Sequence, residues 1–351
     1  MPLKVGIIGY GGMAGWHHKT INDLSELDVI GAYDIRDEVR EKIHKEGLIS
    51  YESGEALCSD PQIDIVIVST PNDTHKLYSI MALRSGKNVI CEKPAVMNAA
   101  ELEEIIAVSK ECGKVFTVNQ NRRWDKDVQK IKKVLNTGIL NNPYYIERRV
   151  QGSRQSLHGW RGYAVNGGGM IYDWGAHLID QFIYLFPGNV ISVDAHLQQI
   201  HSNEVDDNFS MLIRFESGLS VLINVAMNCF IKQPLWHMCC EDGTAIIYDW
   251  DSEGKIVKLN EDTSNMVWDE EIVYTAAGPT RSMAPRPKET TTEIPLPDVD
   301  VDWMDFYRNF CFAVKGTAEQ AVKPEQSLRV MKIIDAAFES SRTKKSVTRV
   351  I

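Results

Sequence analysis

A cluster of small residues directly follows the first apolar run of the chain, residues 5–8. Gly9, Gly11 and Ala14 have the G-x-G-x-x-A spacing at a junction between a strand-like and a helix-like segment. Such glycines permit a tight turn and close approach of a pyrophosphate, and the alanine lets the helix pack on the sheet. The helix N-terminus adds unpaired N–H groups for phosphate. The residues expected at a dinucleotide cofactor here are Gly9, Gly11, Gly12, Met13 and Ala14.

An acidic residue expected after such a motif is present at the end of the second apolar run. Asp34 lies 19 positions past Gly15. A carboxylate there accepts hydrogen bonds from the adenosine ribose and repels a 2′-phosphate, so NAD is favoured over NADP. Arg36 keeps NADP open, because a guanidinium could pair with that phosphate.

The first third of the chain alternates short Val- and Ile-rich runs with helix-length segments. The expected strands are residues 5–8, 29–33, 65–68, 89–91 and 115–118, and helices are expected at 73–84 and 98–112. Asn98, with Glu101 three residues later, is a helix-start signal. This alternation predicts an α/β Rossmann domain with a parallel sheet, assigned to residues 1–122.

The pattern changes after residue 122. Consecutive strand candidates at 190–200, 208–215, 220–227, 235–240 and 245–248 lack helices between them. Residues 123–351 are therefore predicted to form an α+β domain with an open, mainly antiparallel sheet for substrate binding and assembly. Residues 276–298 hold five prolines without periodicity, and we expect a structureless arm, a subunit-contact loop or a lid.

Composition excludes several classes of protein. With 351 residues and a net charge of −10, the chain lacks the basic surface of a nucleic-acid binder. No apolar run approaches the roughly 20 residues that span a bilayer, and no secretion signal begins the chain. Seven scattered cysteines fit reduced thiols. We therefore expect a cytoplasmic protein without nucleic-acid or membrane partners.

Three further segments carry polar residues in positions typical of a reactive site. Residues 69–75 and the segment Glu92-Lys93-Pro94 follow predicted strands, at the edge where ligands of such sheets bind. Asp173, His177 and Asp180 are spaced i, i+4, i+7 on a predicted helix at 169–185, which places them on one face.

These segments together resemble the Gfo/Idh/MocA family, named for glucose–fructose oxidoreductase and inositol dehydrogenase. The resemblance covers nearly the whole chain and implies a dehydrogenase acting on a sugar, glycoside or polyol. It implies Lys93, Asp173 and His177 as catalytic residues, and a cis bond before Pro94. The residues expected at the cofactor, besides the glycine motif, are Asp34, Arg36, Thr70, Pro71, Asn72, His75, Glu92 and Lys93. The residues expected at the substrate are Arg122, Trp160, Arg161, Asp173, His177 and Asp180.

The expected reaction removes a hydride from an alcohol carbon. His177, held in one tautomer by Asp173, takes the hydroxyl proton, and Lys93 stabilises the oxygen; the two could exchange roles. We favour a ring hydroxyl such as C3 of a glycoside. Inositol, a sugar nucleotide, or a non-catalytic NAD(P) sensor remain alternatives, as do the direction of reaction and a tightly retained cofactor. We expect no catalytic metal, and a homodimer or homotetramer through the second sheet.

Overall fold

The amino-terminal residues form a six-stranded parallel sheet with the order β3–β2–β1–β4–β5–β6. Its strands are β1 (Leu3–Ile8), β2 (Leu27–Tyr33), β3 (Ile49–Ser50), β4 (Ile65–Val68), β5 (Asn88–Cys91) and β6 (Phe116–Val118). The connecting helices are α1 (Gly12–Asn22), α2 (Asp37–Lys45), α3 (Gly54–Ser59), α4 (His75–Arg84) and α5 (Ala99–Cys112). The strand order reverses between β1 and β4, so a crevice forms at their carboxyl ends. The predicted Rossmann fold is confirmed.

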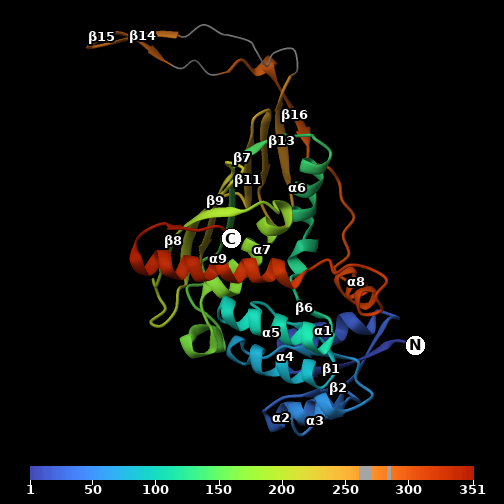
Figure 1. The fold of residues 1–351 in the computed structure, drawn as a ribbon. Helices are drawn as coiled ribbons and strands as arrows, with labels where there is room; N and C mark the ends of the chain where they lie inside the picture. The colour runs from blue at the N-terminus through green and yellow to red at the C-terminus, as the bar shows by residue number, and fades with distance from the viewer. Residues whose placement is uncertain (261–270, 283–285) are drawn as a thin grey trace.

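The computed structural model describes residues 1–260, 271–282 and 286–351. In it, β1 and β4 are buried on both faces, as expected of strands covered by helices on either side. The predicted start of α5 is also confirmed, because the Asn98 side chain accepts a hydrogen bond from the Glu101 amide at 3.0 Å. Figure 1 shows this domain at one end of the molecule, in blue to teal.

The second sheet has nine strands, in the order β16–β13–β12–β11–β7–β10–β9–β8–β17. Its strands are β7 (Pro143–Gln151), β8 (Val190–Gln198), β9 (Asn208–Phe215), β10 (Ser220–Ala226), β11 (Trp236–Cys240), β12 (Gly243–Ile247), β13 (Gly254–Leu259), β16 (Thr291–Pro295) and β17 (Val347–Thr348). Only the β7–β10 pair is parallel. The helices α6 (Lys126–Asn136), α7 (Ala176–Leu185) and α9 (Pro324–Thr343) lie on one side of this sheet (Figure 1). The predicted mainly antiparallel sheet is confirmed.

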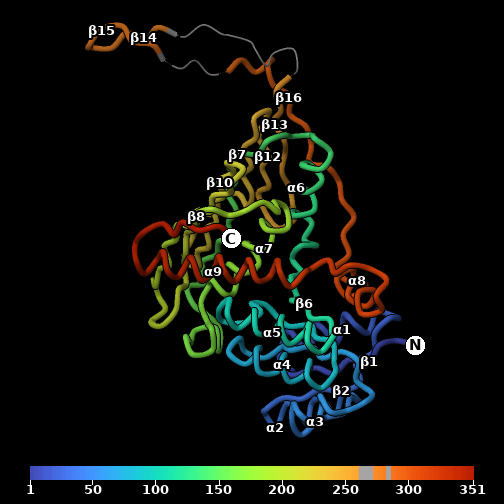
Figure 2. The backbone as a smooth tube through the Cα atoms, viewed as in Figure 1, coloured from blue at the N-terminus to red at the C-terminus, as the bar shows by residue number. Residues whose placement is uncertain are grey.

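One helix of the carboxyl-terminal part packs on the first domain. Phe306, Tyr307 and Phe310 of α8 (Asp305–Val314) are buried in the same cluster as Val5 and Ile67 of the first sheet. Figure 2 shows the chain returning to this position after leaving the second sheet. The division of the chain at residue 122 stays a prediction, and Trp303, just before α8, lines the cleft described below.

The stretch at 276–298 is partly regular, so the prediction of a structureless segment is wrong for much of it. A hairpin of β14 (Glu271–Thr275) and β15 (Gly278–Ser282) precedes β16, which pairs with β13 at the edge of the second sheet. Proline is tolerated at such an edge, and Pro295 ends the strand. Residues 283–285 of the predicted arm lie outside the described residues.

None of the described helices combines the length and apolar character needed to cross a membrane.

Candidate active site

A cleft of about 1010 Å³ lies at the carboxyl ends of the first sheet and reaches the beginning of α7. The predicted residues that line it are Gly9, Gly11, Gly12, Met13, Asp34, Arg36, Thr70, Pro71, Asn72, Glu92, Lys93, Arg122, Trp160, Arg161, Asp173 and His177. Three predicted residues, Ala14, His75 and Asp180, are not part of this lining. The cleft therefore joins the glycine motif at one end to the lysine, aspartate and histidine at the other.

The glycine motif has the shape of a cradle for a pyrophosphate. Gly9 has φ +86°, and a Cβ atom there would lie 2.7 Å from the carbonyl oxygen of Ser69. At Gly11 and Gly12 an added Cβ would meet nothing within 4 Å, so the backbone faces open space in the cleft. Helix α1 begins at Gly12 without a side-chain cap, which leaves its first N–H groups available. These residues fit a dinucleotide cofactor.

Asp34 ends β2 and is held as an anion beside this cradle. Its carboxylate accepts hydrogen bonds from the Tyr10 amide at 2.9 Å and from the Arg36 amide at 3.0 Å. The Arg36 guanidinium pairs with both carboxylate oxygens, at 2.9 and 3.1 Å. Burial by itself would raise the pKa of Asp34, but these hydrogen bonds outweigh it and the pKa is lowered. Both residues line the cleft beside the glycine motif and are paired with each other, and their contact with an adenosine ribose stays a prediction.

His75 supports the loops of the cleft instead of lining it. Its side chain is fully buried, and its ring nitrogens lie 2.9 Å from the carbonyl oxygens of Thr70 and Pro94. Burial lowers the pKa of His75, which favours a neutral ring. Its ring connects the two loops that carry Thr70 and Lys93, and contact with the cofactor stays a prediction. The peptide bond between Lys93 and Pro94 is cis, as the resemblance implied.

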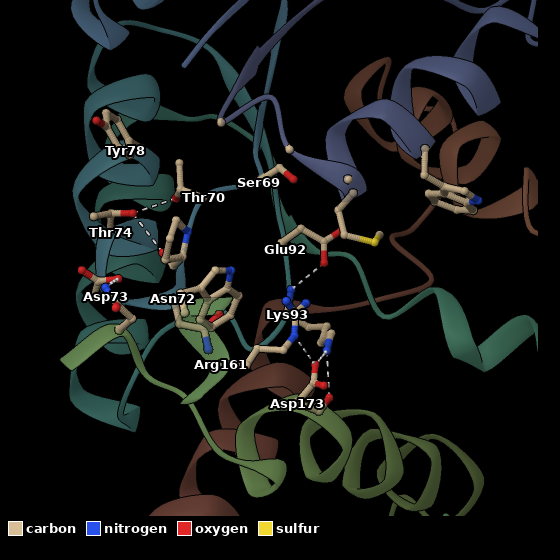
Figure 3. A pocket seen from close by; sticks show the side chains of 18 of the residues that line it. Ser69, Thr70, Asn72, Asp73, Thr74, Tyr78, Glu92, Lys93, Arg161 and Asp173 are labelled. Atoms are coloured by element: carbon tan, nitrogen blue, oxygen red, sulfur yellow. Dashed lines mark hydrogen bonds and ion pairs between the residues drawn. The ribbon is translucent and has the colours of Figure 1, made fainter. Parts of the chain in front are cut away.

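Lys93 crosses the cleft to the second domain, as Figure 3 shows. Its Nζ atom lies 2.7 Å from Asp173 Oδ1 and 2.8 Å from the Asp173 carbonyl oxygen. Arg161 Nε approaches the same carboxylate oxygen at 3.4 Å. Burial opposes ionisation of Asp173, but Lys93 and Arg161 outweigh it and lower the pKa of that carboxyl. The lysine is thus held in one position by a charged hydrogen bond from the other domain.

His177 lies in the same cleft but does not have the predicted partner. Among the described residues nothing bonds its buried Nδ1 atom, and Asp173 pairs with Lys93 and Arg161 instead. The expected Asp173–His177 hydrogen bond is therefore wrong. The reason is local: Ile171–Gly175 form a π-helical turn, whose wider i→i+5 geometry changes the i, i+4 relation that the spacing assumed. Burial, and then the charges of Lys93 and Arg122, hold the pKa of His177 well below its usual range.

Asp180 is part of the protein interior. Its carboxylate forms two hydrogen bonds with the Arg123 guanidinium, at 2.6 and 2.7 Å, and both side chains are almost fully buried. Burial raises the pKa of Asp180, and Arg123 counteracts that effect. Asp180 is not part of the cleft lining, and its predicted contact with substrate stays a prediction. The pair joins α7 to the segment that carries Arg122.

Arg122 is held between aromatic rings and a carboxylate at the substrate end. Its guanidinium carbon lies 4.5 Å from the ring centre of Trp174 and 5.6 Å from that of Trp250. It also donates to Asp125 at 2.9 Å. Burial raises the pKa of Asp125 to about 6. Trp250 follows β12 and has no motif in the sequence, so it could not be associated with Arg122 before the fold was known.

A buried hydrogen-bond network around Glu92 was not predicted from the sequence. His17 Nε2 and Asn119 Nδ2 donate to Glu92 Oε1 at 2.8 and 2.7 Å, and the Lys93 amide donates to Oε2 at 3.2 Å. The other ring nitrogen of His17 bonds the Tyr307 hydroxyl at 2.5 Å. Burial opposes ionisation of Glu92, yet these contacts, chiefly His17, lower its pKa to about 2. The network thus connects α1, the end of β5 and α8.

Two tryptophans that line the cleft were also not predicted. Trp16 and Trp303 lie edge to face with ring centres 5.8 Å apart, one on α1 and the other just before α8. No local pattern marks Trp303, because its place in the cleft depends on the return of the chain to the first domain.

Among the described residues, no group of three or more His, Cys, Asp and Glu side chains is arranged to hold a metal ion.

Comparison with known proteins assigns both halves of the chain. Residues 3–120 match the oxidoreductase family with an NAD-binding Rossmann fold, and residues 128–246 match the GFO/IDH/MocA C-terminal domain. A solved NAD-binding protein from Listeria innocua is 39% identical, with a TM-score of 0.92 and 99% of each chain covered.

Two curated relatives have named activities. Scyllo-inositol 2-dehydrogenase (NADP(+)) IolW of Bacillus subtilis is 28% identical over 98% of this chain and 95% of its own. D-glucoside 3-dehydrogenase of Escherichia coli is 30% identical over 56% of this chain and 57% of its own. Together with the fold and the cleft, these matches show that the chain belongs to the Gfo/Idh/MocA family of NAD(P)-binding oxidoreductases.

Proposed function

We propose that this oxidoreductase is an NAD-dependent dehydrogenase that oxidises a hydroxyl-bearing carbon of a sugar, glycoside or polyol. The observation that carries the proposal is the position of Lys93. Its Nζ atom is fixed 2.7 Å from Asp173, in the same cleft as His177 and continuous with the cofactor cradle. The relatives that act on inositol and on glucosides support this substrate class. The substrate that we favour is a glycoside oxidised at a ring hydroxyl such as the one on C3, and inositol is the alternative substrate.

The residues of the cleft divide the chemistry between them. When bound, the nicotinamide supplies the hydride acceptor. His177 is neutral at pH 7 because its pKa is held low, so its ring can accept the hydroxyl proton. Lys93 donates a hydrogen bond to the same oxygen and stabilises the negative charge that develops there. Asp173 keeps the Lys93 ammonium in place. This assignment gives the proton to His177, with Lys93 as the electrostatic partner.

The preference for NAD rests on Asp34. Its carboxylate is ionised and buried beside the cradle, so a 2′-phosphate would meet a negative charge. The Arg36 side chain is half exposed and could turn toward that phosphate. The relative IolW is described as using NADP(+), and NADP is therefore the alternative cofactor. For assembly we propose a homodimer or homotetramer through the second sheet.

A turnover assay with matched variants tests the proposed function. The purified protein is mixed with NAD or NADP and with glycosides, free sugars, inositols and sugar nucleotides, and reduction of the nicotinamide is followed. We expect turnover with one of these classes and a loss of about 100-fold or more in Lys93→Ala and His177→Ala. Lys110→Ala, on the exposed face of α5, is the control and keeps the wild-type rate.

Cofactor binding separates the outcomes. Binding of NADH, measured by fluorescence, is expected in all of these variants. If Lys93→Ala turns over at the wild-type rate, the proposed chemistry is wrong. If NADH binds but no alcohol is oxidised, and no added ketone is reduced, the protein is a nucleotide sensor and not a dehydrogenase.

A further inference from the structure

Two arginines approach the substrate end of the cleft from different parts of the chain. Arg122 lies just before α6, and Arg161 lies in the segment that leads to the glycine run at 167–169. Both line the cleft together with Lys93 and His177. A neutral sugar needs hydrogen-bond donors and acceptors, but it does not need two guanidinium groups beside a lysine.

Aromatic rings hold each guanidinium in place. Arg161 lies over the Trp160 ring, with its guanidinium carbon 4.6 Å from the ring centre. Arg122 lies over Trp174 at 4.5 Å. When a ring covers the flat face of an arginine, its N–H groups remain available at the edge, in the planar arrangement that binds a carboxylate or phosphate. The two side chains are therefore preorganised donors, and ordering them costs little on binding.

Two of the cations at this end of the cleft, Lys93 and Arg161, share one carboxylate, Asp173. Lys93, Arg122 and Arg161 contribute three cations, and the carboxylates paired with them among the described residues are Asp173 and Asp125. Asp125 pairs with Arg122 at 2.9 Å, and the ionised Glu92 beside Lys93 is held by His17 and Asn119. Burial, and after it Lys93 and Arg122, lower the pKa of His177, so these two cations act on the proton acceptor itself.

We propose that the substrate carries an anionic group, a carboxylate or a phosphate, and that Arg122 and Arg161 bind it while Lys93 and His177 act on a hydroxyl of the same molecule. This inference rests on the proposed dehydrogenase function and narrows its substrate class to sugar acids, polyol acids or their phosphate esters. The bound anion places a negative charge beside the two guanidinium groups and close to His177. It thereby stabilises the imidazolium that forms when His177 accepts the hydroxyl proton.

Matched pairs of alcohols test the proposal. Glucose is compared with glucuronate and with glucose 6-phosphate, and myo-inositol with an inositol monophosphate, in each case with NAD at constant ionic strength. We expect kcat/KM to be about 10- to 100-fold higher for an anionic member, the range for charged hydrogen bonds. Glucuronate and glucose 6-phosphate distinguish a carboxylate from a phosphate. Raising the salt concentration should lower kcat/KM for the anionic member more than for the neutral one.

Variants assign the effect to the two arginines. Arg161→Gln and Arg122→Gln are expected to bring the anionic-to-neutral ratio close to one, and Arg122→Lys to restore it only in part, because lysine lacks the planar fork. Arg154→Gln, an exposed arginine outside the cleft lining, is the control and keeps the wild-type ratio. Thermal melting and NADH binding confirm that each variant is folded.

A binding measurement makes the result independent of turnover. Glucuronate, glucose 6-phosphate and glucose are titrated calorimetrically into the protein saturated with NADH. Tighter binding of an anionic sugar, weakened in Arg161→Gln, supports the proposal. Equal kcat/KM for neutral and anionic members overturns it and leaves the dehydrogenase function intact. If neither the neutral nor the anionic alcohols are oxidised, the proposed function fails. The calorimetric titration still decides whether the cleft prefers an anion.

Discussion

The two ends of the cleft are built from different parts of the polypeptide. The cofactor end is made largely of backbone: Gly9 turns the chain, an added side chain at Gly11 or Gly12 would face open space, and α1 begins there without a side-chain cap. The substrate end is made of side chains that reach one another from separate elements, such as Lys93 and Asp173, 80 positions apart. A backbone cradle needs only a local sequence, whereas a side-chain site needs the whole fold.

The difference extends to charge. At the cofactor end, Asp34 and Arg36 neutralise each other two residues apart. At the substrate end, Lys93 and Arg161 share Asp173, and the charges of Lys93 and Arg122 act on His177. Substitutions at the substrate end should therefore change the rate, and those at the cofactor end should change which nucleotide binds.

The largest effect is expected at the contact between the domains. Asp173→Asn keeps the size of the side chain but removes the charge that holds Lys93, so kcat should fall about 100-fold, as for a misplaced catalytic group. NADH affinity should stay unchanged, measured by fluorescence titration. Glu103→Gln, on the exposed side of α5, is the matched control. Wild-type kcat in Asp173→Asn would show that Lys93 is positioned by other contacts.

A smaller effect is expected at the cofactor end. Asp34→Ala should weaken NAD binding about tenfold, through loss of its charged hydrogen bonds to the ribose, and should strengthen NADP binding. Dissociation constants for the two reduced cofactors measure this preference. Arg36→Ala is the counterpart and should affect NADP more than NAD. A wild-type protein that already prefers NADP would contradict our assignment of Asp34.

Weakening the hydrogen-bond network around Glu92 should lower kcat a few-fold. Tyr307→Phe removes only the hydroxyl that bonds His17. His17 should then hold Glu92 less firmly, and Glu92 should hold the Lys93 amide less firmly. One such hydrogen bond is worth about 1 kcal/mol, or about fivefold in kcat/KM. The loss should appear in kcat, with NADH affinity kept, because the network positions Lys93 without touching substrate. Tyr274→Phe, on the exposed hairpin, is the control. An equal loss of melting temperature and no loss of kcat would mean a purely structural network.

The smallest change is expected in the pH profile. An essential histidine with an ordinary pKa near 6.5 would lose about fourfold in kcat/KM between pH 7.5 and pH 6.0. The pKa of His177 is held well below that value, so the neutral form persists as the pH falls and kcat/KM should change by less than about 1.5-fold. An acid limb centred near pH 6.5 would show that His177 is not shielded as the structure indicates.

The fold and the cofactor end could be predicted from local patterns. The alternation of apolar runs and helices implied the parallel sheet, and the position of Gly9, Gly11 and Ala14 after the first strand implied the cradle. Asn98 and Glu101 marked a helix start that the structure has. These features depend on residues that are neighbours in sequence, so a short segment contains all the information that they need.

The partners of the reactive side chains were decided by tertiary structure alone. Spacing on an assumed α-helix paired Asp173 with His177, but a π-helical turn and the approach of Lys93 from the other domain gave Asp173 a different partner. Asp180 and His75 were assigned to the site from their positions in motifs, yet both are buried in structural contacts. A side chain acts on whatever lies within a few ångströms of it, and long-range packing decides which residues those are. The sequence of this protein therefore determined the nucleotide cradle, whereas only the packing of the two domains determined the chemistry opposite it.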